Sequence, residues 1–303
     1  MTREKNLTDL TDSKTASSAQ DKKKEKLQDN EVSSTSTSDN TEKVQVERSD
    51  SDEDAAELIP NHNFAFLKNK SEDRNTCLIS SGEKWFEDVS EEIEGDGCNK
   101  YWMGKIEKYT KAAWDKDIEY YKKASKKGSK KSETVWMETV MKSGTLNDKF
   151  SAYVLLLQDS PIHNLSVLET LIDFVNLKSR RPCLMAIENL QKLFLEVLLI
   201  PNRKLKNFDK HPHSKLSELS GGNIDIIDKY LISWMFEDRL KKLYQKFLDN
   251  LELVGKDSID KTKIKALSTL LELLAGNPEQ ESLLLGKIVN KLGKNYNNNA
   301  VYA

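Results

Sequence analysis

The sequence has few of the residues that build metal centres and enzyme active sites. Its 303 residues include only three cysteines and four histidines. No CxxC pair is present, and no cysteine stands near a histidine along the chain, so we expect neither a disulfide framework nor a structural zinc site. A glycine-rich phosphate loop and a GxSxG motif are also missing. We therefore expect no enzyme activity, no cofactor, no metal ion and no small-molecule substrate.

Long apolar runs are missing as well. No stretch reaches the roughly 18 apolar residues that a membrane-spanning helix needs. The first residues, Met1 to Asp12, are polar and lack the apolar core of a secretory signal. We expect no membrane insertion and no secretion, and the unpaired cysteine pattern fits a reducing compartment.

A net charge of −2 conceals two oppositely charged regions. Residues 1–60 hold 9 Lys or Arg against 15 Asp or Glu, whereas residues 100–131 hold 11 Lys against 4 acidic residues. Residues 1–57 are rich in small polar and charged residues, and this composition predicts a disordered acidic tail. Within it, Ser49 and Ser51 are each followed by acid three residues later, which is typical of an acidophilic kinase site. The alternative is a solvated acidic run.

Residues 58–98 are predicted to be a partly ordered linker. Two short apolar patches, one around Phe64 and one at Trp85, leave open a linear motif that docks on this chain's own helices or on a partner. From Asn99 the apolar residues recur with a helical period. We predict a basic helix over residues 99–131 and a disordered end over residues 294–303.

Residues 132–293 are predicted to be an all-α solenoid of degenerate helix pairs, similar to HEAT or armadillo arrays. Successive apolar stripes of about 12–20 residues are separated by short breaks, and no alternating strand pattern of any length occurs. A compact helix bundle is the alternative. Val135 and Trp136 are expected on a buried face, residues 227–254 form one long helix or two, and Gly293 ends the last helix.

The basic stretches are the candidate contacts for nucleic acid, since lysine and arginine bind phosphates. The alternative is that these side chains complement helix dipoles or are simply solvated. The histidines are read as ordinary loop or packing residues, Cys183 as a core residue, and Glu237 as a surface or interhelix ion-pair group. The candidate contact residues are Lys122, Lys123, Lys126, Lys127, Lys130, Lys131, Arg180, Arg181, Arg203 and Lys204.

Six stretches within residues 136–293, about half the chain, resemble the CCAAT-binding-factor family of the nucleolar complex protein 1 type. They are residues 144–164 (GTLNDKFSAYVLLLQDSPIHN), 178–190, 198–205 (LLIPNRKL), 236–243 (FEDRLKKL), 277–281 (NPEQE) and 289–293 (VNKLG). The departures from the family pattern in the first stretch, at Phe150, Tyr153, Val154 and Leu157, are apolar or aromatic exchanges on a packing face.

The resemblance implies a non-enzymatic α-solenoid that acts in large-ribosomal-subunit assembly in the nucleolus. It implies contact with early precursor rRNA, with a partner similar to nucleolar complex protein 2, and with the pre-large-subunit particle. The alternatives are a DNA-binding transcription regulator of the CCAAT-binding type and a scaffold that binds only proteins. Because the family continues well beyond the VNKLG stretch, we expect a truncated gene product.

Overall fold

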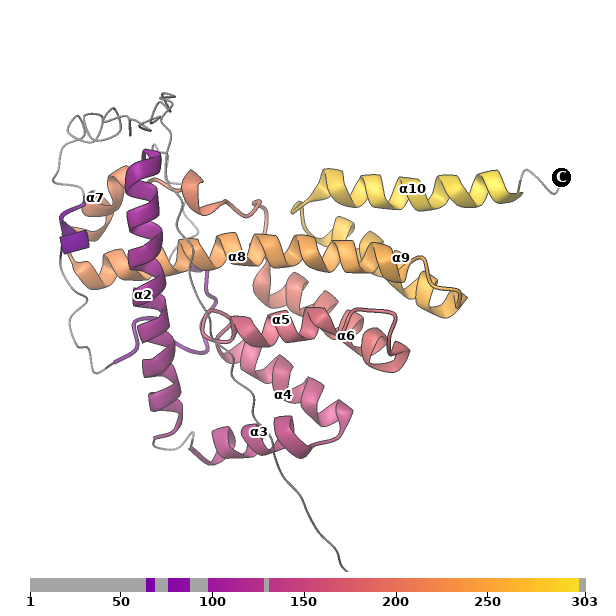
Figure 1. Cartoon of the computed structure of the whole chain (residues 1–303), viewed down its shortest axis with the longest axis horizontal. Coiled ribbons are helices and arrows are strands. Elements are labelled where there is room, and N and C mark those ends of the chain that lie inside the picture. The colour runs from indigo at the N-terminus through magenta and orange to yellow at the C-terminus, as the bar shows by residue number, and fades with distance from the viewer. Residues whose placement is uncertain (1–63, 69–75, 88–97, 128–130, 300–303) are drawn as a thin grey trace, which may run out of the picture. The chain divides into compact units, whose positions relative to one another are not determined.

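The computed structural model of the chain describes residues 64–68, 76–87, 98–127 and 131–299. Within this part there are nine α-helices and no strand, so the all-α prediction is confirmed (Figure 1). The α-helices are α2 (Lys100–Ser125), α3 (Lys131–Ser143), α4 (Leu146–Asp159), α5 (Leu165–Asp173), α6 (Arg180–Leu193), α7 (Leu216–Ser220), α8 (Ile224–Val254), α9 (Asp260–Gly276) and α10 (Glu281–Asn299). The predicted tail with Ser49 and Ser51, and Lys130, lie outside the described residues.

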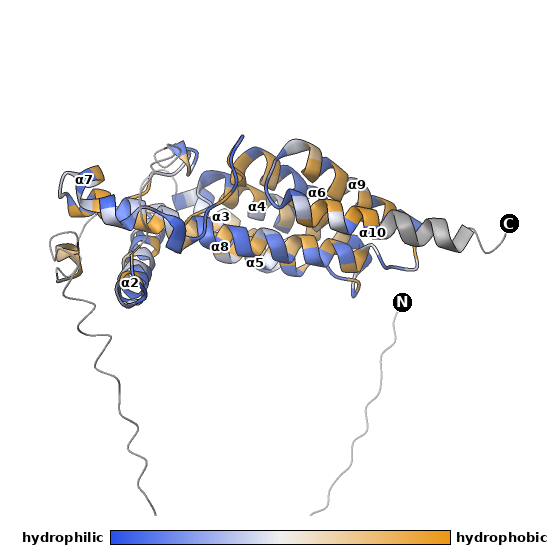
Figure 2. Ribbon diagram, turned by 90° about the horizontal axis from the view of Figure 1, so that it is seen from above, coloured by the Kyte–Doolittle hydropathy of each residue, from blue (hydrophilic) through white to orange (hydrophobic). Residues whose placement is uncertain are grey.

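The helices from α4 onward pack in two layers, as in an α-solenoid. One layer contains α4, α6 and α9, and the other contains α5 and α8, which Figure 2 shows as two rows. Helices α4, α5 and α6 pack successively against one another, and so do α7, α8, α9 and α10. At the end of the array, α10 packs on α9, and its Lys287 Nζ lies 2.7 Å from both Asp249 Oδ1 and Glu252 Oε2 of α8. This arrangement is the helix-pair architecture expected of a solenoid.

The helix boundaries follow from local sequence. Thr145 caps α4, and the Thr145 amide donates to Asp148 Oδ2, so the two residues form a capping box. Asn99 caps α2 by accepting a hydrogen bond from the Trp102 amide at 3.1 Å. Gly221 ends α7 with a φ of 57°, a left-handed conformation that glycine adopts without strain. None of the described helices is both long and apolar enough to cross a membrane.

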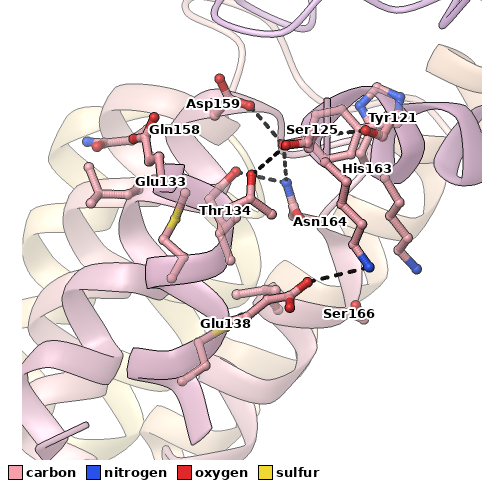
Figure 3. A pocket seen from close by; sticks show the side chains of 17 residues that line it. Tyr121, Ser125, Glu133, Thr134, Glu138, Gln158, Asp159, His163, Asn164 and Ser166 are labelled. Atoms are coloured by element: carbon pink, nitrogen blue, oxygen red, sulfur yellow. Dashed lines mark hydrogen bonds and ion pairs between the residues drawn. The ribbon is translucent and has the colours of Figure 1, made fainter. Parts of the chain in front are cut away.

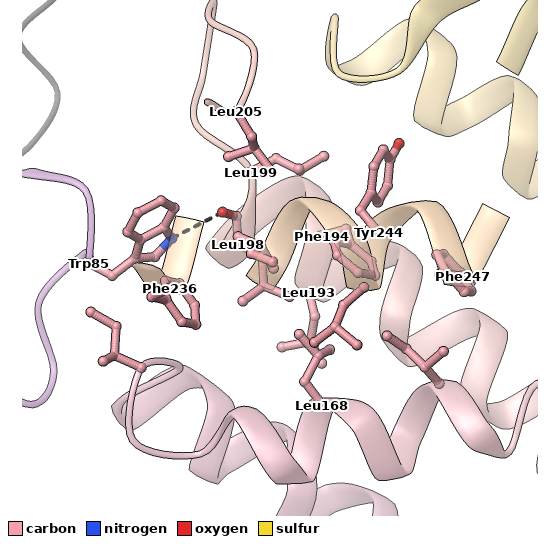
Figure 4. Close-up of a cluster of buried hydrophobic side chains, with 14 of the residues drawn as sticks. Trp85, Leu168, Leu193, Phe194, Leu198, Leu199, Leu205, Phe236, Tyr244 and Phe247 are labelled. Carbon is pink, nitrogen blue, oxygen red and sulfur yellow. Dashed lines mark hydrogen bonds between the residues drawn. The ribbon is translucent and has the colours of Figure 1, made fainter. Parts of the chain in front are cut away.

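The core is formed where the π-helical turn after α6, Phe194–Leu198, packs against α8 and the neighbouring helices. Leu168, Phe194, Leu198, Phe236 and Phe247 are all fully buried there (Figure 4). The Phe194 and Phe247 rings are stacked with their centroids 5.3 Å apart. Since burial of one such side chain contributes about 1.5–3 kcal/mol, this cluster provides most of the driving force for folding of the central helices.

The segment before α2 is part of the core and not only a linker. Trp85 is buried, donates from Nε1 to the Leu198 carbonyl at 3.0 Å, and meets the Phe236 ring edge-on at 4.9 Å (Figure 4). Phe64 stacks on Trp102 of α2 at 5.3 Å. The Leu198 carbonyl belongs to a π-helical turn, Phe194–Leu198, that ends the α6 helix. Residues 64–68 and 76–87 therefore dock on the chain's own helices, which is one of the interpretations that the sequence left open for residues 58–98.

Two local predictions need correction, and one open choice is resolved. The helix carrying Val135 and Trp136 contains no buried residue, and both side chains are 53% exposed. Gly293 does not end the last helix, since α10 runs through it to Asn299, so the disordered end predicted at 294–303 is wrong for 294–299. Residues 224–254 form one continuous helix, α8, which settles the choice between one helix and two.

Candidate functional site

The predicted basic contact surface lies at the junction of α2 and α3. We call it the lysine corner, and its described members are Lys122, Lys123, Lys126, Lys127 and Lys131, all exposed. Two of them form weak surface ion pairs, Lys123 with Glu119 at 3.6 Å and Lys126 with Glu138 at 3.7 Å. Exposed pairs of this kind contribute at most about 1 kcal/mol, so the lysines stay free to exchange these partners for phosphates.

A groove opens beside the lysine corner, between α2, α3 and the α4–α5 junction. Its volume is about 670 Å³, and Lys122 and Lys126 of the corner are among its lining residues. Figure 3 shows the polar end of the groove, where the Tyr121 hydroxyl donates to Asp159 Oδ2 at 2.8 Å and accepts from Asn164 Nδ2 at 3.4 Å. The apolar lining comes from Met137, Met141, Leu155, Leu156 and Val167. The corner is thus a charged rim around a partly apolar depression.

Arg180 and Arg181 stand at the first turn of α6. Arg180 forms a bidentate pair with Asp257, with Nε to Oδ2 at 2.9 Å and NH2 to Oδ1 at 3.0 Å, and its side chain is 47% exposed. The hydrogen bonds from Arg180 hold the pKa of the Asp257 carboxyl well below its usual range. Because positive charge at a helix N-terminus opposes the dipole, dipole complementation does not explain these arginines.

Arg203 and Lys204 have different environments, although they are neighbours. The Arg203 side chain is only 10% exposed and forms a bidentate pair with the fully buried Glu237, at 2.6 and 3.1 Å. Lys204 is exposed and lies 3.9 Å from Glu281. Arg203 therefore forms an internal ion pair between a loop and α8, where the sequence predicted a surface or interhelix pair for Glu237, while Lys204 faces solvent.

The loop that contains these two residues is held by side chains from two other parts of the chain. We call residues 199–206 the strap. The Leu205 amide donates to Glu279 Oε2 and the Lys206 amide to Glu237 Oε1, both at 2.6 Å. Asn277 Nδ2 donates to the Ile200 carbonyl at 2.9 Å. The strap thus connects the stretches 198–205, 236–243 and 277–281, three of those that carry the family resemblance.

His211 and His213 are buried packing residues. His211 stacks on Trp234 at 4.8 Å, and His213 Nε2 donates to the Phe208 carbonyl at 2.8 Å. Burial lowers the pKa of His211 to about 3, helped by His213, Arg203 and Lys206. Glu237 Oε2 is 3.6 Å away, which is too long for a hydrogen bond, and its charge is already matched by Arg203.

The structure brings the lysines of the corner together but keeps the arginines apart from them. The groove residues were not predicted, because Tyr121, Met137 and Asp159 carry no local motif and meet only when three helices pack. Assignment of the ten basic residues to nucleic-acid contact stays a prediction.

Known proteins share this chain's sequence over most of its length. It is 38% identical to human CCAAT/enhancer-binding protein zeta over 234 residues, which is 76% of the chain and 22% of the human protein. It is 31% identical to the Chaetomium thermophilum ribosome biogenesis protein NOC1 over 274 residues, 85% of the chain. The chain belongs to the CCAAT-binding-factor family.

A third family member is Drosophila melanogaster nucleolar complex protein 1, which is 35% identical over 167 residues. The matched part is 14% of the fly protein and 25% of the Chaetomium protein, so the chain spans about a quarter or less of the length of these family members. No family model matches the chain.

Proposed function

We propose that the chain is a non-enzymatic ribosome biogenesis factor of the nucleolus, which holds precursor rRNA and partner proteins on its helical array during maturation of the large subunit. The observation that carries the proposal is the identity to a ribosome biogenesis protein and to a nucleolar complex protein over a continuous helical region. An extended array of helix pairs offers many exposed faces for large partners, which suits a scaffold.

The lysine corner is the proposed RNA contact. Five exposed lysines on two adjoining helix ends present a concentrated positive surface, and their surface ion pairs cost little to break. Arg180, Arg181 and Lys204 extend the proposed contact, whereas Arg203 is assigned to the strap because Glu237 neutralises it. For single-stranded RNA, binding through six phosphates gives a slope of about −4 for log K against log salt.

The proposed protein contact lies at the other end of the array. Large apolar side chains are exposed along α9 and α10, with Ile264 66% and Val289 61% exposed and Leu271 close to half exposed. Exposed apolar surface of this kind is typical of a protein interface. A partner similar to nucleolar complex protein 2 is the proposed occupant.

The deciding experiment is crosslinking of the chain to RNA in cells followed by sequencing of the bound RNA. We expect reads concentrated on precursor rRNA, and a strong loss of crosslinking when Lys122, Lys123, Lys126, Lys127, Lys130 and Lys131 are changed to Glu. The matched control reverses six exposed lysines elsewhere: Lys142, Lys178, Lys192, Lys210, Lys256 and Lys261. Reads scattered away from precursor rRNA refute the function, and an equal loss in the control refutes the lysine corner.

Two other functions predict different results. The name of the human relative refers to CCAAT and enhancer binding. A DNA-binding regulator would prefer a CCAAT duplex to an rRNA competitor of equal length. A scaffold that binds only proteins would retain its partners after nuclease treatment and give no crosslinked RNA.

A further inference from the structure

Three side chains that are distant in the sequence converge beside the groove. Cys77 comes from the segment before α2, Asp117 from the middle of α2, and His163 from the turn between α4 and α5. Their ligand atoms all lie within 4.8 Å of one another, and Asp117 and His163 are buried. No cysteine–histidine cluster is visible along the sequence, but the fold builds one in space.

His163 Nε2 faces two groups at once, and the Cys77 thiol also lies 3.7 Å from the Asp117 carbonyl oxygen. This nitrogen lies 3.0 Å from Asp117 Oδ2 and 3.3 Å from Cys77 Sγ. A neutral imidazole nitrogen carries either one proton or one lone pair, so it makes one good hydrogen bond and not two. Three donor atoms of different elements that face one point are the arrangement of a metal site.

The surroundings hold these donor atoms in place. His163 Nδ1 is 2.6 Å from Ser160 Oγ, and the imidazole stacks parallel to the Tyr121 ring at 4.4 Å. Asp117 uses its other oxygen, Oδ1, to accept from the Leu78 amide at 2.7 Å, which leaves Oδ2 for a ligand. Such partners behind the ligands fix the tautomer of a metal-binding histidine and the rotation of a metal-binding carboxylate.

A nucleophilic cysteine is disfavoured at this position. While no cation is bound, burial, followed by the charge of Asp117, raises the pKa of the Cys77 thiol to about 12, the opposite of what a reactive thiolate requires; a bound cation would lower it. In addition, the histidine contacts Asp117 and Cys77 through the same nitrogen, so it cannot be oriented by the acid while it accepts the thiol proton.

We propose that Cys77 Sγ, His163 Nε2 and Asp117 Oδ2 bind one zinc ion, with water as the fourth ligand. Zinc is the divalent ion that best accepts a mixed sulfur, nitrogen and oxygen set in a tetrahedral site. With standard zinc bond lengths, tetrahedral geometry sets the Asp117 and His163 ligand atoms about 3.3 Å apart and the Cys77 and His163 atoms about 3.6 Å apart. The separations of Asp117 Oδ2 and of Cys77 Sγ from His163 Nε2 reach those values with movements of a few tenths of an ångström.

Such an ion would fasten the segment of residues 76–87 to α2 and to the α4–α5 turn, beside the lysine corner. Its binding would release the thiol proton of Cys77, because the thiolate is the ligand. Cys77 is half-buried and provides the route of entry from solvent. The inference does not depend on the proposed ribosomal role.

The test measures metal bound to the purified full chain. After removal of metal by a chelator, titration with Co²⁺ should give a thiolate-to-cobalt absorption band that saturates at one equivalent and is displaced by Zn²⁺. Cys77→Ser should abolish the band. Cys98→Ser, the same change at a half-buried cysteine outside the cluster, should leave it unchanged.

A second variant distinguishes a loss of metal binding from a loss of the fold. Asp117→Asn retains an oxygen for the Leu78 amide but is a poorer ligand, and we expect it to weaken cobalt binding by at least about tenfold with an unchanged circular dichroism spectrum. The proposal is overturned if the unmodified chain gives no thiolate band, if the band is lost with Cys98→Ser, or if folded Asp117→Asn binds cobalt as tightly as the unmodified chain.

Discussion

Removal of the Arg203 guanidinium should destabilise the folded chain more than removal of a solvent-exposed charge does. Glu237 is fully buried and Arg203 is 10% exposed, so the Arg203→Met change leaves a carboxylate without its charged partner inside the protein. Breaking a buried pair in this way costs about 3–5 kcal/mol. The Lys206 amide still donates to Glu237 Oε1, so we expect the lower end, about 3 kcal/mol.

The assay is urea unfolding monitored by tryptophan fluorescence, since Trp234 is buried beside His211 next to this pair. A loss of about 3 kcal/mol corresponds to a fall in melting temperature of about 6–12 °C for a domain of this size. Arg180→Met is the matched control. It also takes a bidentate partner from a buried carboxylate, Asp257, but Arg180 is 47% exposed, so water can replace it and the cost should be smaller.

A loss below about 1 kcal/mol in Arg203→Met would refute the reasoning, because it would mean that water reaches Glu237. The double variant Arg203→Met with Glu237→Met should recover part of the stability, since no unpaired charge then remains. If Arg203→Met instead weakened RNA binding without loss of stability, Arg203 would be a phosphate contact and not a strap residue.

Three further predictions concern pH, docking and capping. Burial holds the pKa of His211 at about 3 in the folded chain, against about 6.5 in the unfolded chain, so the unfolded state gains a proton first on acidification. Stability should therefore be full above pH 6.5 and fall by up to about 1.4 kcal/mol per pH unit toward pH 3. His211→Gln should flatten that slope in urea titrations at several pH values. Trp85→Ala removes a buried side chain and its hydrogen bond to the Leu198 carbonyl, so it should lower the free energy of unfolding by about 3–5 kcal/mol. It should also expose residues 76–87 to limited proteolysis. Unchanged proteolysis would contradict the docking of this segment on the helices. Thr145→Ala should cost about 1 kcal/mol in thermal unfolding, with Ser as the control that keeps the cap, and equal losses in the two variants would speak against the capping bond.

Local features of the fold could be predicted from the sequence, because their causes lie within one helical turn. The capping box at Thr145 needs only residues 145 and 148, and the buried stripe of α6 follows from the helical period around Cys183 and Ile187. The prediction that Gly293 ends the last helix is wrong, because a glycine weakens a helix by only about 1 kcal/mol and does not end it unless the chain also turns there.

Features made by distant residues could not be predicted. Arg203 and Glu237 are 34 residues apart, and a basic residue in a loop looks the same whether it faces phosphate or a buried acid. Cys77 and His163 are 86 residues apart, so no spacing rule connects them. Trp136 was placed on a buried face because its period is helical, but the period does not show whether a neighbour covers that face.

The strap has a consequence for how the chain unfolds. In an ideal repeat array each unit touches only its neighbours, and the array can unravel from either end one unit at a time. Here the Leu205 amide is bonded to Glu279, 74 residues later, and Trp85 is bonded to Leu198, 113 residues away. The segment before α2 and the turn before α10 are therefore tied to Leu198 and to the strap that follows it, so we expect fraying from the ends to be suppressed and the array to lose its structure in one cooperative transition.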